Sequence, residues 1–269
     1  MRIQTEEWKR FVPGVRYYRG KRTLFYNGEK IWEGNYFEGR PLVYNYEERD
    51  SWQVVIVLPG VEVISEFTFF GCENLKTVIM SDTVKRIEND AFNSCKFLHF
   101  IKLSRNLEYI GGFAFWYCES LTSIFIPPTC REIGKNTFWG CKCLSILGMP
   151  QNIELGDEVF KRTALIRKAT CCEVDEDGWY ESDRDETVIQ WIKSINNDEI
   201  YALHRSCSSF NPLTEIIHGL VKRQGIESMR AENAIGITPS QYLEANTFAD
   251  ISEKEIINRF VLNSMGELF

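Results

Sequence analysis

Hydrophobic residues recur along the middle of the chain at a fixed interval of 23 residues. The interval aligns whole columns of side chains of one type, among them an aromatic column and a cysteine column. The clearest columns are Val55, Val78, Ile101 and Ile124; Val57, Met80, Leu103 and Ile126; Ile64, Ile87, Ile110 and Ile133; Phe69, Phe92, Phe115 and Phe138; Cys72, Cys95, Cys118 and Cys141; and Leu75, Leu98, Leu121 and Leu144. A fixed period of this length indicates a solenoid of stacked coils.

Each copy of the repeat contains a pattern typical of a short β-strand. In "LKTVIM" (75–80), two inward apolar residues alternate with outward ones, and turn residues flank them. The next segment, "DTVKRIENDAF" (82–92), is expected to turn the chain back toward the following strand. Stacked copies would share one core and a parallel hydrogen-bond ladder, which a single copy cannot form.

The evenly spaced cysteines could be a redox site, a metal site, a set of disulfides or core packing. In a stack they lie directly above one another, next to the phenylalanine column. A free cysteine packs as a small apolar residue, whereas zinc sites use clustered cysteine and histidine pairs. We therefore interpret the cysteine column as structural and expect no metal site.

The repeat "L-x-x-I-x-(I/L)-P-x-x-(V/C)-x-x-I-x-x-x-(A/T)-F-x-x-C-x-x-L" resembles the BspA-like leucine-rich repeat family, most fully at 123–145, "SIFIPPTCREIGKNTFWGCKCLS". The resemblance covers residues 54–166 as about five coils. It implies a parallel sheet on a concave side and a role in binding, with no catalytic residues to transfer. Some family members are bacterial surface adhesins, and others are intracellular proteins of single-celled eukaryotes.

The flanks of the repeat have different patterns. In residues 1–53, "TLFYNGEKIW" predicts a β-hairpin that turns at Asn27 and Gly28, and "RPLVYNYEERDSWQVVIVL" (40–58) predicts a second one. We interpret 1–53 as an N-terminal β-hairpin cap. Residues 167–186 are predicted to be an acidic linker, and 187–269 a helical domain.

Three stretches of the last region have apolar residues at helical spacing. They are "ETVIQWIKSI" (186–195), "PLTEIIHGLVKRQG" (212–225), which ends at Gly225, and "SEKEIINRFVL" (252–262), which begins with a capping box. "YALHRSC" (201–207) and "GITPSQYL" (236–243) resemble parts of a degenerate ankyrin repeat. That resemblance implies a second interaction scaffold and a structural role for His204.

Charge and cysteine content limit the classes of partner. The chain has a formal charge of −7, and residues 167–269 contain 18 acidic against 10 basic residues. An acidic chain without a basic patch argues against nucleic acid and anionic membranes as partners. A charged N-terminus, "MRIQTEEWKRF", and nine cysteines favour free thiols in an intracellular setting, cytoplasmic or nuclear.

Few residues suggest a catalytic or phosphate-binding site. His204 and Cys207 lie one helical turn apart and could form a thiolate–imidazole pair, but no orienting group or oxyanion-hole signal accompanies them. "GKNT" (134–137) lacks the upstream glycine of a phosphate loop. We expect no catalytic residues, no cofactor and no metal.

Two candidate binding surfaces follow from residues that point away from the core. On the strands, outward positions are expected to face water, yet several are apolar. We define the concave strip as Ile56, Ile79, Phe100, Lys102 and Phe125, and the convex aromatic stripe as Phe70, Trp116 and Trp139. Another part of the chain could instead cover the strip, and the aromatic residues of the stripe could pack on neighbouring coils.

The sequence therefore predicts an α+β chain: a leucine-rich-repeat solenoid between a β-hairpin cap and a helical domain. The predicted function is non-enzymatic binding of a protein partner. An exported surface adhesin is the alternative, and a thiol-dependent enzyme using Cys207 is the third hypothesis.

Overall fold

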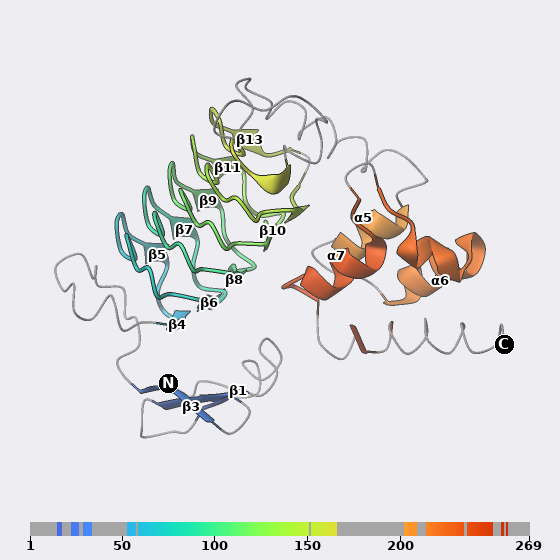
Figure 1. The fold of residues 1–269 in the computed structure, drawn as a ribbon, viewed down its shortest axis with the longest axis horizontal. Coiled ribbons are helices and arrows are strands. Elements are labelled where there is room, and N and C mark those ends of the chain that lie inside the picture. The colour runs from blue at the N-terminus through green and yellow to red at the C-terminus, as the bar shows by residue number, and fades with distance from the viewer. Residues whose placement is uncertain are drawn as a thin grey trace.

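A computed structural model gives the structure of the chain. It describes the backbone of residues 15–17, 23–26 and 29–33, and also residues 53–57, 59–150, 152–165, 202–208, 214–233, 236–249, 254, 255 and 257. Figure 1 shows a small N-terminal sheet, a stack of coils and a group of helices beyond the last coils. The predicted α+β architecture with a leucine-rich-repeat solenoid is confirmed.

The predicted strands form one side of the stack. They are β4 (Val54–Val57), β6 (Thr77–Met80), β8 (Phe100–Lys102), β10 (Ser123–Phe125) and β12 (Ile146–Gly148). Val55 pairs with Val78 and Val78 with Ile101, all parallel and 23 residues apart. The ladder is interrupted between β8 and β10, so this side consists of a three-stranded and a two-stranded sheet.

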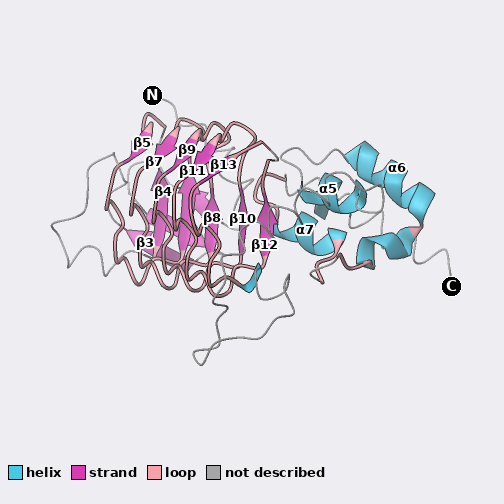
Figure 2. Cartoon of the chain, turned by 90° about the horizontal axis from the view of Figure 1, so that it is seen from above, coloured by secondary structure: helices cyan, strands magenta, loops and turns pink. Residues whose placement is uncertain are grey.

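A second set of strands, which the sequence analysis did not predict, forms another side of each coil. They are β5 (Val63–Ile64), β7 (Arg86–Ile87), β9 (Tyr109–Ile110), β11 (Glu132–Ile133) and β13 (Glu154–Leu155), joined in one five-stranded parallel sheet. Each of these strands has two residues, too few to show an alternating pattern in the sequence. Figure 2 shows both sets of strands running side by side along the stack.

The third side consists of turns with two left-handed residues in every coil. The first set is Phe67, Asp90, Phe113, Asn136 and Glu158, and the second is Gly71, Ser94, Tyr117, Gly140 and Arg162. A left-handed conformation costs an ordinary residue about 1–2 kcal/mol. It lets alternate amides reach the next coil: Phe69 N–H donates to the Ala91 carbonyl and Gly71 N–H to the Asn93 carbonyl, both at 2.7 Å.

The phenylalanine column is a continuous stack in the core. Ring centroids are 4.9 Å apart between Phe69 and Phe92, 5.2 Å between Phe92 and Phe115, and 5.4 Å between Phe115 and Phe138. Each of these rings is fully buried. The stack continues to Phe160 in the fifth coil, so the aromatic column connects all five coils.

The N-terminal part contains the predicted hairpin. Strands β2 (Thr23–Tyr26) and β3 (Glu29–Glu33) pair antiparallel, with Tyr26 opposite Glu29. An additional strand, β1 (Val15–Tyr17), pairs with β2. The second predicted hairpin lies mostly outside the described residues, and the capping role of 1–53 stays a prediction.

The helical segment comprises α5 (Ala202–Ser208), α6 (Thr214–Gln224), the 3-10 helix η2 (Ile226–Arg230), α7 (Pro239–Ala245) and the loop 246–249. Helix α6 ends at Gly225, as predicted; this glycine has a φ of 85° and its N–H donates to the Val221 carbonyl. The helix predicted at 186–195 and the linker at 167–186 lie outside the described residues. Of 252–262 only residues 254, 255 and 257 are described, and they are helical.

Candidate functional site

The cysteine column is buried packing, as predicted. Cys72, Cys95, Cys118 and Cys141 are free thiols with no exposed surface. Cys95 Sγ donates to the Phe69 carbonyl at 3.1 Å, and the next two cysteines repeat this contact one coil further at 3.2 and 3.1 Å. Burial raises the pKa of the Cys118 thiol, so the group keeps the proton that it donates. The thiols therefore tie each coil to the preceding phenylalanine.

His204 and Cys207 are both buried in α5. His204 Nε2 lies 3.0 Å from the Ala231 carbonyl oxygen and 3.1 Å from that of Ile237. Two acceptors require Nε2 to carry a hydrogen, which ties α5 to the segment before α7. Burial raises the pKa of Cys207 to about 12, so its thiolate is scarce at neutral pH. These contacts fit a structural histidine; the likeness to ankyrin stays a prediction.

The concave strip is covered over much of its length. Ile56 and Phe100 are half-buried, but Ile79, Lys102 and Phe125 are each only 2% exposed. The strand pattern places these side chains on the outer face, since they alternate with core residues along β6, β8 and β10. Other parts of the molecule therefore bury them. The binding role of the strip stays a prediction, because a partner reaches these three residues only after that cover moves.

The convex aromatic stripe follows the turn side of the coils. Phe70 is 38% exposed and contacts Phe67, a left-handed turn residue that is 42% exposed. In the second coil the equivalent positions are polar: the Asn93 amide donates to the Asp90 carboxylate at 2.6 Å. The stripe is therefore interrupted after its first coil.

Aromatic residues return in the third and fourth coils. Trp116 packs edge to face on Trp139, with ring centroids 5.9 Å apart, and also contacts Phe113. Lys135 lies 5.5 Å from the Phe113 ring centroid, and Lys161 lies 5.8 Å from that of Trp139. The Nε1 donors of both tryptophans are buried without a hydrogen-bond partner in the part of the chain that the structure describes.

The sequence analysis missed three aromatic residues at the surface of the coils: Phe67 and Phe97 are exposed, and Phe113 is half-buried. Phe67 and Phe113 occupy the first left-handed column, and Phe97 is 56% exposed near the end of the second turn. The repeat contained a partial sign of this aromatic column, because residues 67 and 113 are both phenylalanine and lie 46 positions, or two periods, apart. Their exposure depended on the turn conformation, which the pattern alone did not specify.

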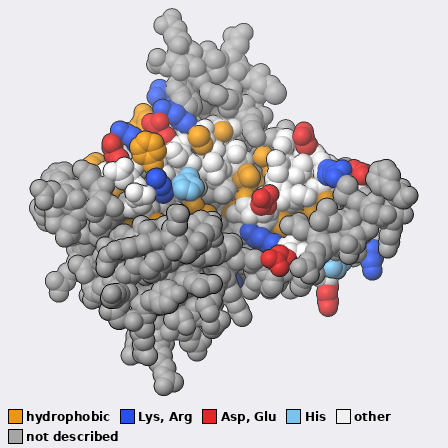
Figure 3. Space-filling view, turned by 60° about the horizontal axis from the view of Figure 1, so that its bottom comes forward, with side chains coloured by type: hydrophobic (Ala, Val, Ile, Leu, Met, Phe, Trp, Pro, Cys, Tyr) orange, Lys and Arg blue, Asp and Glu red, His pale blue; other side chains and the backbone are white. Residues whose placement is uncertain are grey.

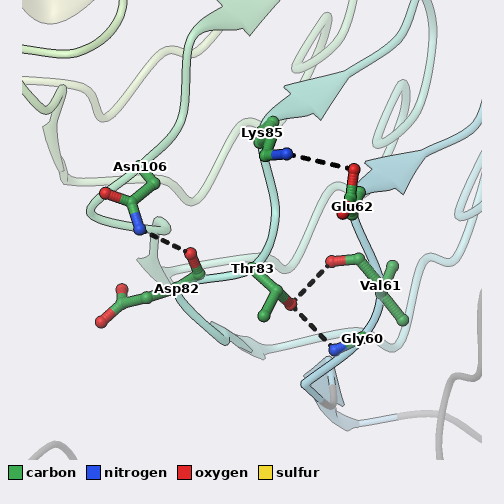
Figure 4. Close-up of polar contacts among 7 residues, drawn as sticks. All are labelled: Gly60, Val61, Glu62, Asp82, Thr83, Lys85 and Asn106. Atoms are coloured by element: carbon green, nitrogen blue, oxygen red, sulfur yellow. Dashed lines mark hydrogen bonds and ion pairs between the residues drawn. The ribbon is translucent and has the colours of Figure 1, made fainter.

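Polar side chains hold the edges of the coils together. The Thr83 hydroxyl donates to the Val61 carbonyl at 2.8 Å and accepts from Gly60 N–H at 3.1 Å (Figure 4). Lys85 Nζ lies 3.2 Å from Glu62 in the neighbouring coil. Each of these contacts joins residues 22 or 23 positions apart, so they help to set the register of neighbouring coils.

Charge alternates in sign down two exposed columns. One is Glu62, Lys85, Glu108, Arg131 and Glu154, and the other is Glu73, Lys96, Glu119 and Lys142. Lys96 lies 2.7 Å from Glu73, and Lys142 lies 3.1 Å from Glu119. On the face drawn in Figure 3, basic and acidic side chains are also interspersed. Because opposite charges face each other in adjacent coils, these columns stabilise the stacking of the coils. They do not form a surface of uniform charge that would attract a ligand of the opposite charge.

No chemical site emerges among the described residues. They contain no group of three or more His, Cys, Asp or Glu side chains placed to hold a metal ion. Thr137 of the "GKNT" stretch donates within the solenoid, to the Gly134 and Gly111 carbonyls at 2.6 and 3.0 Å. Within the same described ranges, no helix is long and apolar enough to cross a bilayer.

Comparison with known proteins identifies the repeat. Residues 47–174 match the family described as BspA type Leucine rich repeat region, in six copies. No match was found among curated proteins.

Three solved structures are similar to the chain. A leucine-rich repeat protein from T. pallidum is 22% identical, with 41% of this chain and 76% of that chain covered and a TM-score of 0.32. One from Bacteroides ovatus is 21% identical (56% and 48% covered, TM-score 0.27). A leucine-rich cell surface protein from Faecalibacterium prausnitzii is 16% identical (56% and 52% covered, TM-score 0.31), so the chain spans about half the length of the last two.

Proposed function

We propose, from the premise that residues 47–174 belong to the BspA-type leucine-rich repeat family, that the chain is a non-enzymatic protein-interaction module. The solenoid presents side chains on a rigid frame, because each coil is hydrogen-bonded and stacked on its neighbours. The pKa of Cys207, raised to about 12, argues against the thiol-enzyme hypothesis.

The observation that carries this proposal is the exposure of aromatic side chains on the turn side of the coils. Phe67 and Phe70 are 42% and 38% exposed and lie in edge-to-face contact. Aromatic residues are enriched among the residues that dominate binding energy at interfaces. The convex aromatic stripe, extended by Phe67, is therefore the surface that we assign to a protein partner.

Affinity capture from the native cell tests this assignment. The double variant Phe67→Asp/Phe70→Asp should lose a protein that the unaltered chain captures. Ile216→Asp is the matched control, because Ile216 is a 50% exposed residue of α6, far from the stripe in sequence. Equal capture by the double variant would exclude this part of the stripe as the binding surface.

The concave strip is tested separately in the same assay. Phe100→Asp alters a half-buried strip residue and avoids the fully buried Phe125, where an added charge would destabilise the fold. Loss of the partner with Phe100→Asp alone would assign binding to the strip.

We also propose an intracellular location, cytoplasmic or nuclear. The seven cysteines that the structure describes are free thiols, which fits a reducing compartment. A surface adhesin is the alternative. Alkylation of the protein in freshly lysed cells separates the two: a reactive thiol at the exposed Cys143 supports the intracellular location, and an oxidised one supports the adhesin.

A further inference from the structure

One column on the outer face of the strands is half-buried in the first coil and buried in the next three, where Ile79, Lys102 and Phe125 are each 2% exposed. Ile56 on β4 is half-buried, whereas Phe125 on β10 is 2% exposed although it also points away from the core. An outward residue of a sheet is buried only when another element lies over it. The element over Phe125 can be identified from two separate contacts.

The first contact is at Gly148 on β12. A Cβ atom added to Gly148 would lie 2.4 Å from the Phe125 Cδ1 atom and 3.2 Å from the Ser208 carbonyl oxygen. The Phe125 ring therefore lies against the bare Gly148 backbone, and the last residue of α5 reaches the same place. Figure 2 shows α5 and α7 beside β12.

The second contact is the loop after α7. Asn246, Thr247, Phe248 and Ala249 are all buried although they are not helical. Arg105, which follows β8, donates to the Phe248 carbonyl at 3.5 Å. The Asn246 amide donates to the Cys207 carbonyl at 3.0 Å, so the loop is tied to α5 on its other side. The loop thus lies between the helices and the solenoid.

Each of the two parts has its own internal bonding. The helical segment is held by the contacts of α5 with α6 and α7, by His204, and by the Thr238–Gln241 capping box. The solenoid is held by its ladders of strands, phenylalanines and cysteines. Between them, the 3.5 Å distance from Arg105 Nη2 to the Phe248 carbonyl oxygen is longer than the 2.7–3.2 Å that is usual for such a hydrogen bond. The named ladders, the His204 contacts and the capping box each lie within one part and would remain after separation, whereas separation would expose apolar surface that is now buried in one cluster across both parts.

We propose that the helical segment is a detachable cover on the C-terminal end of the concave strip. While it is docked, Phe125 is closed to any other molecule; when it leaves, Phe125 and its neighbours become a free apolar surface. The cover is thus an autoinhibitory contact within one chain. This inference is independent of the convex aromatic stripe, and a failure of the capture experiment at that stripe leaves it unchanged.

Hydroxyl-radical footprinting with residue-level mass spectrometry tests the cover in the full-length chain. In a graded urea series, modification of Phe125 should rise by about tenfold before that of Phe115 changes and before the helical signal is lost. Phe115 is the internal control because it is fully buried inside the solenoid. Simultaneous exposure of Phe125 and Phe115 would overturn the proposal, because the contact would then be part of one cooperative fold.

Two variants test the same contact without denaturant. Phe248→Asp places a charge in the buried loop, and Gly148→Ala pushes on the Phe125 ring and α5 from the solenoid side. Both should raise the modification of Phe125, while the controls Ile216→Asp and Gly219→Ala leave it unchanged, since Ile216 is exposed and nothing lies within 4 Å of a Cβ at Gly219. Full protection of Phe125 in both test variants would show that the helices do not cover it.

Discussion

The solenoid and the helical segment achieve their stability in different ways. In the solenoid one contact recurs in three successive coils, as the thiols of Cys95, Cys118 and Cys141 each reach the phenylalanine carbonyl of the preceding coil. In the helical segment each contact occurs once, as when His204 reaches the Ile237 carbonyl. A repeated contact leaves a periodic signal in the sequence, and a single contact leaves none. The two parts should also respond differently to the same kind of substitution.

The largest loss of stability is expected when the stack of phenylalanine rings is interrupted. Phe115→Ala removes a fully buried ring that lies between Phe92 and Phe138. It should lower the free energy of unfolding by about 3–5 kcal/mol, because a buried ring is lost and the cavity cannot collapse between stacked coils. Urea denaturation measures the change. Phe97→Ala is the control, since Phe97 is 56% exposed, and a similar loss in both variants would contradict the role of the stack.

A glycine-to-alanine substitution should lower the stability of the solenoid at one position and raise the stability of the helical segment at another. A Cβ at Gly134 would lie 2.3 Å from the backbone nitrogen of Gly112 in the adjacent coil. Gly134→Ala should therefore destabilise the solenoid by about 1–3 kcal/mol through overpacking. Gly219→Ala in α6 meets nothing within 4 Å and should stabilise the helix by up to about 1 kcal/mol. Thermal unfolding measures both, and the same sign in both variants would contradict this contrast.

The sequence predicted the solenoid well because its period aligned chemically identical columns. The burial of Phe69 and Cys72 and the pairing of Val55 with Val78 follow from that alignment alone. The left-handed turns at Phe67 and Phe113 did not follow from it, because phenylalanine has no preference for that conformation. The second strands escaped prediction because two residues are too short for a pattern.

The sequence was less informative for the candidate site. It showed that Ile79 and Phe125 are apolar on an outward face, but it did not show what covers them. The cover involves Ser208 and Phe248, far away in sequence and outside the repeat, so no period connects them to Phe125. Contacts of this kind depend on the whole fold and not on local pattern.

A helix cap offers a smaller test that is confined to the helical segment. Thr238 accepts a hydrogen bond from Gln241 N–H at 3.2 Å, and the Gln241 side chain accepts one from Thr238 N–H at 2.8 Å. Thr238→Ala removes the first of these hydrogen bonds and should lower the free energy of unfolding by about 1 kcal/mol. Circular dichroism during thermal unfolding measures the loss. Thr238→Ser keeps the hydroxyl and should restore most of the stability; equal loss in both variants would exclude the cap as the cause.

The smallest expected effect is a pH dependence of the stability of the helical segment between pH 7.5 and 5. Burial lowers the pKa of His204 below its ordinary value of about 6.5, and the two carbonyl contacts at Nε2 oppose this shift only in part. As the pH falls through about 6.5, the unfolded chain binds a proton that the folded chain binds less readily, so the free energy of unfolding falls. Unfolding followed by the helical signal from pH 7.5 to 5 should show this decline. His204→Gln retains an N–H donor but cannot titrate in this range, so its stability should vary less with pH than that of the unaltered chain. Identical pH profiles of the two proteins would show that His204 is not the titrating group.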